Sequence, residues 1–298
     1  MTHQTIIHDT TRQFSQSEQK FVKKIMDLAV EDWLKHINSQ HPLTVELTIR
    51  DDLGSAAALT LVRATYQVPV ADLGAKTLKT SVAAYKLAFG YDHNGEDPDI
   101  FIEVNAGTID KAFYYEDPGY LYSIFVHELS HGLFLNNLNS VYSAAMTPID
   151  RHIGEGVHGR MLGGHNLLAI TGGRPVPFSS EGAHLAMATA NAFQSSLGPY
   201  DTPGSNRNVT KLDVAIASDS GLPTKFDDTI YAGRYPGNLD AGDGNDDVFF
   251  DAPIKAFKIA HAGKSWTITN SAENYEIQLL NVETLRFSDG WRHWTDPI

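Results

Sequence analysis

The chain has 298 residues, of which 42% are hydrophobic and 10% aromatic, and its formal net charge is −13. This length is sufficient to bury a large core, in one domain or in two. The negative charge argues against nucleic acid and anionic membranes as partners. No apolar run reaches the ~20 residues that a membrane-spanning helix needs.

The sequence contains no cysteine. Disulfides, thiolate metal ligands and a cysteine nucleophile are therefore excluded, and any metal must be held by histidine, aspartate or glutamate. Thirteen histidines supply many candidates. The polar segment 1–14 lacks the apolar centre of a conventional N-terminal signal peptide.

The first part of the chain predicts helices that alternate with strands. Ser15 and Glu18 form a capping box, which opens a helix whose apolar side chains recur at three- and four-residue spacing. Residues 45–50 alternate between apolar and polar side chains and so indicate a half-buried strand. The pattern then predicts a strand region over 57–68, a helix over 75–89 and a mostly buried strand over 99–105.

The next predicted helix carries the pattern H-E-x-x-H. Asp117 followed by Pro118 is typical of a helix start. His127 and His131 lie one turn apart on one face, so both imidazoles can reach one metal ion. Glu128 follows the first histidine, where its carboxylate can take a proton from water. Burying these three side chains without partners would be costly, and a metal ion removes that cost.

Residues 136–203 are rich in glycine and contain the histidines His152, His158, His165 and His184. Long irregular segments inside a domain are usually functional or disordered, so we expect a third metal ligand in this segment. A short helix is predicted over 212–217.

The character of the sequence changes from residue 224 onward. Residues 240–247 form a loop of acids and glycines. Short runs with the composition of strands then follow at 256–259, 266–269, 275–280 and 285–287. This pattern predicts a small all-β module at the C-terminal end.

Taken in order, these stretches resemble the secreted bacterial zinc metalloproteases of the leishmanolysin-like branch of the metzincins. In that family a strand ending in Asn precedes the zinc helix, a G-x-x-V-P stretch leads to a distant third histidine, and an L-D-x-A-x-L-x-D-x-G helix closes the domain. The resemblance covers most of residues 15–223, and the stretches that carry it are 99–105, 120–135, 173–177, 182–185 and 212–216. It implies that His127, His131 and His184 bind zinc and that Glu128 is the general base.

The chain departs from the family pattern at two positions. The family has glycine three residues after the second histidine, where the helix turns sharply, and this chain has Phe134. A bulky residue is unfavourable at positive φ, so we expect the helix to run on to Asn136 and Asn137. The methionine turn of the family is also missing, and residues 194–199 stand in its place with Leu197 as the nearest apolar substitute.

Other residues remain candidates for the third ligand. His165 is the rival histidine, with His158 behind it. Glu155 or Glu181 would instead make a site of two histidines and one carboxylate. Any one of these histidines, taken alone, is also compatible with an ordinary solvated loop residue.

The tail resembles the C-terminal end of RTX proteins, which are calcium-binding repeat proteins exported by type I secretion. Residues 241–248 match the G-G-x-G-x-D-x-U repeat, with Ala241 for the first glycine. The resemblance implies secretion, a type I secretion apparatus as a partner, and calcium bound through Asp243, Asn245 and Asp246. The alternative is an acidic hairpin loop without an ion, because one good repeat supplies only half of a calcium site.

Together these patterns predict an α+β fold in which a metzincin-like zinc protease domain, a mixed twisted sheet plus the active-site helix, spans 1–223. A β-rich RTX-like module follows over 224–298. The predicted function is zinc-dependent hydrolysis of a peptide or protein substrate, with Glu128 as general base. Two alternatives stay open: a zinc hydrolase with a carboxylate third ligand and a non-protein substrate, and a secreted binding module whose catalytic site has decayed. The sequence predicts no oligomeric state.

Overall fold

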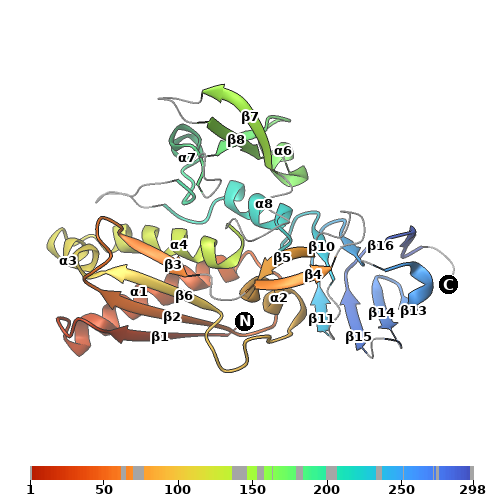
Figure 1. Ribbon diagram of the computed structural model, residues 1–298, viewed down its shortest axis with the longest axis horizontal. Helices are drawn as coiled ribbons and strands as arrows, with labels where there is room; N and C mark the ends of the chain where they lie inside the picture. Colours follow the sequence, from red (N-terminus) through yellow and green to blue (C-terminus); the bar gives the residue numbers. More distant parts are fainter. Residues whose placement is uncertain are drawn as a thin grey trace.

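The chain folds as a mixed α+β protein with several sheets, as the sequence predicted (Figure 1). In the part described, no helix is both long and apolar enough to cross a membrane. The computed structural model describes residues 2–61, 65–69, 77–135, 146–152, 158–162, 164–178, 184–198, 207–232, 237–250, 252–270, 272 and 275–295.

The N-terminal sheet has the strand order β1-β2-β6-β3. Strands β1, β2 and β6 are parallel, and β3 runs antiparallel to β6 at the edge. The strands predicted over 45–50 and 99–105 are confirmed, whereas β1 was not predicted. Their bounds are β1 (His3–Asp9), β2 (Leu43–Arg50), β6 (Ile100–Asn105) and β3 (Ala58–Leu61).

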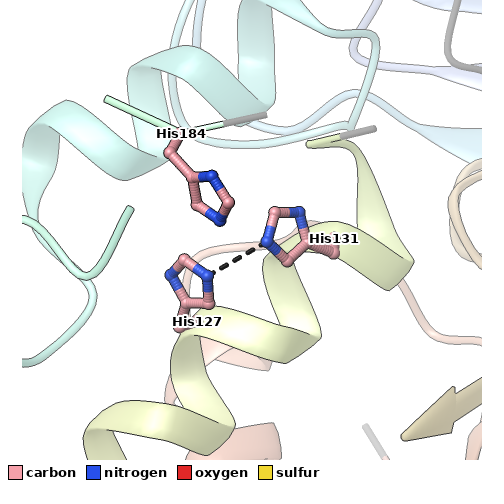
Figure 2. Close-up of side chains that lie close together, drawn as sticks. All are labelled: His127, His131 and His184. Carbon is pink, nitrogen blue, oxygen red and sulfur yellow. Dashed lines mark hydrogen bonds between the residues drawn. The ribbon is translucent and has the colours of Figure 1, made fainter. Parts of the chain in front are cut away.

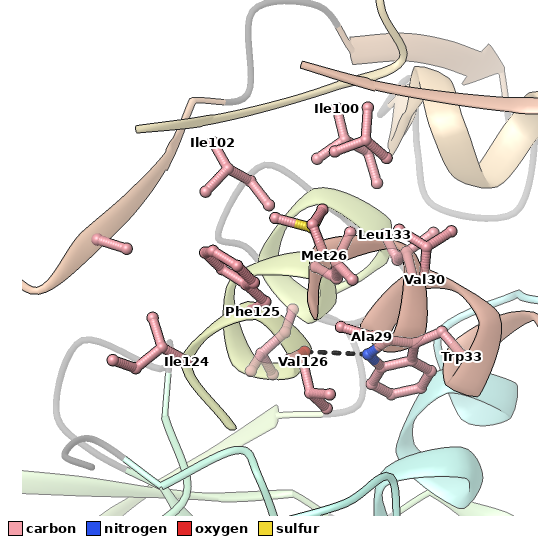
Figure 3. Close-up of a cluster of buried hydrophobic side chains, with 14 of the residues drawn as sticks. Met26, Ala29, Val30, Trp33, Ile100, Ile102, Ile124, Phe125, Val126 and Leu133 are labelled. Carbon is pink, nitrogen blue, oxygen red and sulfur yellow. Dashed lines mark hydrogen bonds between the residues drawn. The ribbon is translucent and has the colours of Figure 1, made fainter. Parts of the chain in front are cut away.

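Two long helices, α1 (Gln16–Leu34) and α4 (Pro118–Leu133), pack against each other, and α4 also contacts β3 and β6 (Figure 3). The predicted capping box is confirmed, because the Ser15 hydroxyl accepts from the Glu18 N–H and the Glu18 carboxylate accepts from the Ser15 N–H. At the helix crossing the indole Nε1 of Trp33 donates to the backbone carbonyl of Val126 at 3.0 Å. Helix α4 is thereby tied to α1 as well as to the sheet.

The end of α4 corrects the sequence-based prediction. The helix ends at Leu133 and does not run on to Asn136 and Asn137, which lie outside the described residues. Phe134 follows with φ −150° and ψ −29°, and a negative φ needs no glycine. Its side chain is fully buried and meets the Trp33 ring edge-on at a centroid distance of 5.3 Å. This core contact holds the bulky Phe134 side chain, so the chain can leave the helix here without a glycine.

The helix predicted over 75–89 is wrong in its first part. Strand β5 (Thr77–Ser81) pairs with β4 (Thr65–Pro69), and helix α2 (Val82–Phe89) begins only afterwards. The Ser81 hydroxyl accepts from the Ala84 N–H and so caps the helix start. The same hydroxyl lies 2.7 Å from the Leu133 carbonyl, which ties this cap to the end of α4.

The central part of the chain lies on the far side of α4 from the N-terminal sheet (Figure 1). Strands β7, β8 and β9 form an antiparallel sheet there. The helix predicted over 212–217 is confirmed and extends slightly further, as α8. The elements are α3 (Ala106–Tyr114), β7 (Met146–His152), β8 (His158–Leu162), α6 (His165–Ile170), β9 (Val176–Phe178), α7 (Met187–Phe193) and α8 (Lys211–Asp219).

The described residues after 223 form short strands and one 3-10 turn, η2 (Ile254–Ala256). The strands make two sheets, in the orders β10-β12-β16-β17 and β11-β15-β14-β13, whose inner side chains form a second buried cluster. Side chains from α2, among them Tyr85 and Phe89, join that cluster. The boundary at 223/224 stays a prediction. The strands are β10 (Thr229–Tyr231), β11 (Gly237–Asp240), β12 (Asp247–Phe249), β13 (Lys258–Ala262), β14 (Ser265–Asn270), β15 (Tyr275–Leu280), β16 (Thr284–Phe287) and β17 (Gly290–His293).

Replacing Trp33 tests how strongly the helix crossing stabilises the fold. We expect Trp33→Phe to lower the free energy of unfolding by about 1–3 kcal/mol, because it removes a buried hydrogen bond and leaves part of the indole volume empty. Urea denaturation measures the change. The matched control is Trp291→Phe, since Trp291 is 60% exposed and its replacement should change stability by less than about 0.5 kcal/mol. Equal effects of the two substitutions would contradict the assignment.

Candidate metal centre

Three histidine side chains converge beside α4 (Figure 2). His127 and His131 come from successive turns of that helix, and His184 comes from the segment just before α7. One ring nitrogen from each lies within 4.8 Å of the other two. The Nε2 atoms of His127 and His131 are 3.0 Å apart, and the ring of His184 stacks on that of His127 at a centroid distance of 5.1 Å.

Backbone carbonyls set the orientation of the two helix histidines. Nδ1 of His127 lies 2.7 Å from the carbonyl oxygen of Ser196, and Nδ1 of His131 lies 2.7 Å from that of Leu135. A carbonyl oxygen only accepts, so each Nδ1 carries the ring proton and each Nε2 presents a lone pair. Two lone pairs facing each other at 3.0 Å repel unless a cation or proton lies between them. The arrangement therefore suits a metal ion.

A buried carboxylate holds the turn that supplies the Ser196 carbonyl. Asp213, in the first turn of α8, is fully buried and accepts from the Ser195 hydroxyl, the Ser196 N–H and the Thr210 N–H. Burial raises the pKa of Asp213 to about 6, although these hydrogen bonds lower it. Leu197 is fully buried in this turn, and its carbonyl accepts from the Leu185 N–H next to His184.

Burial keeps the imidazoles in the form that a metal requires. It holds the pKa of His127 well below its usual value, with the neighbouring histidines adding to the effect. It also lowers the pKa of His184 to about 4, again with a contribution from His131. Both rings are thus neutral near pH 7, and a neutral imidazole is the metal-binding form.

Glu128 is buried, and its carboxylate contacts Thr60 of the edge strand β3. Its Oε2 lies 2.7 Å from the Thr60 hydroxyl, which also lies 2.7 Å from the Glu128 backbone carbonyl. Burial raises the pKa of Glu128, while His131 and hydrogen bonds from Thr60 lower it. A carboxylate held within electrostatic reach of the histidine group could exchange a proton with water at a bound metal.

The structure brings together the candidate ligands His127, His131 and His184, with Glu128 within electrostatic reach of His131. The rival ligands are not placed: Glu155 and Glu181, and the side chains of His158 and His165, lie outside the described residues. Within the described parts of the chain, the histidine trio is the one group of three or more such side chains close enough to share an ion.

The predicted calcium ligands differ in their exposure to solvent. Asp243 and Asn245 are exposed, whereas Asp246 is fully buried. Oδ1 of Asp246 accepts from the Asp228 N–H, and Oδ2 has no hydrogen-bond partner among the described residues. Burial, together with the neighbouring carboxylates of Asp228 and Glu283, raises the pKa of Asp246 to about 8. Calcium binding here stays a prediction.

Sequence reasoning missed the residues that position the histidines. The backbone carbonyls of Leu135 and Ser196 cannot be recognised as histidine partners from a pattern of side chains. Asp213 lay in a recognised stretch, and Thr210 three residues before it is a capping-box signal that could have identified it. Thr60 contacts Glu128 across 68 residues of sequence, and no local pattern reports such a contact.

Comparisons with known proteins leave the identity of the chain open. No family model matches it, and no curated protein matches it. Among solved structures, the extracellular lipase LipA from Serratia marcescens is similar over 22% of this chain and 14% of the lipase, with 15% sequence identity and a TM-score of 0.19. The chain thus spans a small fraction of that lipase, and a likeness this weak supports no conclusion about fold or function.

Removing single candidate ligands tests the composition of the centre. We expect His184→Ala to weaken zinc binding by at least ~10-fold, because it removes one of three converging nitrogen donors. Competition with a chromophoric chelator measures the affinity. His165→Ala is the matched control and should bind zinc like the wild type. The reverse result, a loss with His165→Ala or Glu181→Ala alone, would assign the third ligand elsewhere.

The buried acid Asp246 predicts a pH dependence of stability. Its folded-state pKa of about 8 lies above the unfolded value near 4, so the native state binds more protons between these values. Stability therefore falls as the pH rises from about 4 to about 8. We expect Asp246→Asn, measured by thermal unfolding with chelator present, to flatten this dependence and to be more stable than the wild type above pH 8.

The control is Asp243→Asn, an equivalent change at an exposed position of the same loop. Its melting curve should shift with pH as the wild type's does. If Asp246→Asn also kept the full slope, another group would be the source of the pH dependence.

Proposed function

We propose that this chain is a zinc-dependent endopeptidase of the metzincin type. The observation that carries the proposal is the convergence of three imidazoles, with the buried Glu128 carboxylate within electrostatic reach of His131. Two nitrogen ligands of a tetrahedral zinc ion lie about 3.3 Å apart, close to the 3.0 Å between the two Nε2 atoms. Three protein ligands leave a fourth position open, as catalytic zinc sites do.

The donor set favours zinc over the common alternatives. Imidazole nitrogens suit zinc and neighbouring transition metals, whereas magnesium and calcium prefer oxygen ligands. When bound, zinc supplies Lewis acidity toward a water molecule and a carbonyl oxygen. His127, His131 and His184 would hold the ion, and Glu128 would take a proton from water and pass it to the leaving amine.

The arrangement of the sheet supports a peptide as the substrate. Strand β3 lies at the sheet edge, next to the helix that carries the site. An edge strand offers backbone N–H and C=O groups to which an extended peptide can pair. A peptide bound along β3 would pass close to Glu128, because Thr60 of that strand contacts the carboxylate.

We further propose that residues 224–298 form an RTX-like module and that the protein is secreted. The support is the sequence pattern of residues 241–248 and the parallel pairing of the short strands β10 with β12, β12 with β16, and β11 with β15. Parallel strands joined without helices are typical of stacked β-repeats. Export by a type I apparatus rests on the sequence pattern alone.

The decisive experiment compares the wild type with Glu128→Gln. Both proteins should carry about one zinc ion, since Glu128 is not a ligand, but the variant should lose ~10²- to 10⁴-fold in peptide hydrolysis because the general base is gone. Elemental analysis and a casein or quenched-peptide assay measure the two quantities. Gln is the matched replacement because it keeps the shape and can still accept from Thr60.

Each other outcome would support a different function for the protein. If both proteins bind zinc and neither cleaves peptides, the centre serves another substrate or the enzyme is latent. If neither binds zinc, the binding-module alternative replaces the endopeptidase.

A further inference from the structure

Thr60 occupies an unusual place relative to the candidate general base. It lies on the edge strand β3, opposite Ile102 of β6. Its hydroxyl is 2.7 Å from Oε2 of Glu128 and also 2.7 Å from the backbone carbonyl of the same residue. One side chain on the sheet edge therefore contacts both the carboxylate and the backbone carbonyl of Glu128, the general base of the proposed function.

We propose that Thr60 is a positioning residue that fixes the Glu128 carboxylate beside the histidine group. The inference rests on the proposed function for its catalytic meaning, but the contact itself does not. A hydroxyl has one proton, so the two Glu128 oxygens share it. The carboxylate is then held in one rotamer relative to its own helix.

The surroundings of Thr60 make the contact rigid. A β-branched side chain has few χ1 rotamers, so the hydroxyl position follows from the strand. The strand is fixed by pairing with β6, and α4 is fixed by contacts with β3, β6 and α1. A general base gains its effect from placement, and misplacement by about 1 Å can cost 10²-fold in rate.

The contact also places the base beside the proposed peptide site. A peptide paired with the outer edge of β3 would lie next to Thr60, whose hydroxyl contacts the Glu128 carboxylate. Thr60 therefore acts in the turnover step and not in metal binding, because its hydroxyl bonds to the carboxylate and the backbone carbonyl of Glu128 and not to a histidine of the group.

Two substitutions separate this role from a structural one. Thr60→Val removes the hydroxyl at nearly constant shape, and Thr60→Ser keeps it. We expect Thr60→Val to lower kcat for peptide hydrolysis by roughly 10- to 100-fold with KM and zinc content unchanged. Thr60→Ser should stay within about 3-fold of the wild type, since the donor is retained. Thr48→Val on β2 is the matched control, because Thr48 lies two strands away in the same sheet.

A second readout does not depend on activity. In crystals of the metal-free proteins, the Glu128 carboxylate should occupy one position in the wild type and in Thr60→Ser, and should be displaced or spread over several positions in Thr60→Val. An unchanged carboxylate in Thr60→Val would overturn the proposal, as would an unchanged kcat or an equal loss in Thr60→Ser. If the wild type hydrolyses no peptide but the crystals differ as expected, the positioning role stands and the endopeptidase function fails.

Discussion

The candidate centre depends on one constraint: two backbone carbonyls fix the rings of His127 and His131 so that their Nε2 lone pairs converge. H-E-x-x-H spacing alone only places the two side chains on one helix face. Free imidazoles on that face would rotate about χ1 and χ2, and ordering them would cost entropy when an ion bound. Hydrogen bonds to the carbonyls of Ser196 and Leu135 order both rings when the protein folds, so an ion that binds later loses less conformational entropy. Such contacts behind the ligands raise metal affinity.

Each carbonyl is in turn held by a feature distant from the motif. The Leu135 carbonyl reaches His131 because α4 ends at Leu133 and Phe134 is anchored against Trp33. The Ser196 carbonyl reaches His127 because Asp213, buried at the start of α8, accepts from Ser195 and Ser196. A methionine is thus not required at position 197 for the turn to hold its shape, since hydrogen bonds to a buried carboxylate define it.

Sequence reasoning located what is local and periodic. The Ser15 capping box, the alternating strand β2 and helix α4 with its Asp117 cap all follow from short-range physical chemistry, and the structure has them. Sequence reasoning failed where pairing between separate segments determines the secondary structure. Strand β1 forms because β2 offers a parallel partner, and β5 is a strand because β4 pairs with it, although its residues continue without interruption into α2.

The same distinction applies to the site. His127, Glu128 and His131 are visible in the sequence because one helix spaces them. His184 was identified only through a family resemblance, since 53 residues of sequence separate it from His131. Thr60 and Asp213 act through other residues and across long separations, so their roles could be read only from contacts.

Burial shifts the pKa values of His127 and Glu128 in the candidate centre in opposite directions. The same desolvation lowers the pKa of His127 and raises that of Glu128, so it favours the neutral form of both the ligands and the base. For the ligands that form is the one that binds metal. For Glu128, in contrast, the neutral form is protonated and cannot take a proton from water. A divalent ion among the three imidazoles would reverse only the second effect, because a nearby positive charge stabilises the Glu128 carboxylate without protonating the histidines. In the proposed enzyme, metal binding and activation of Glu128 as a base would therefore be coupled by a single electrostatic cause.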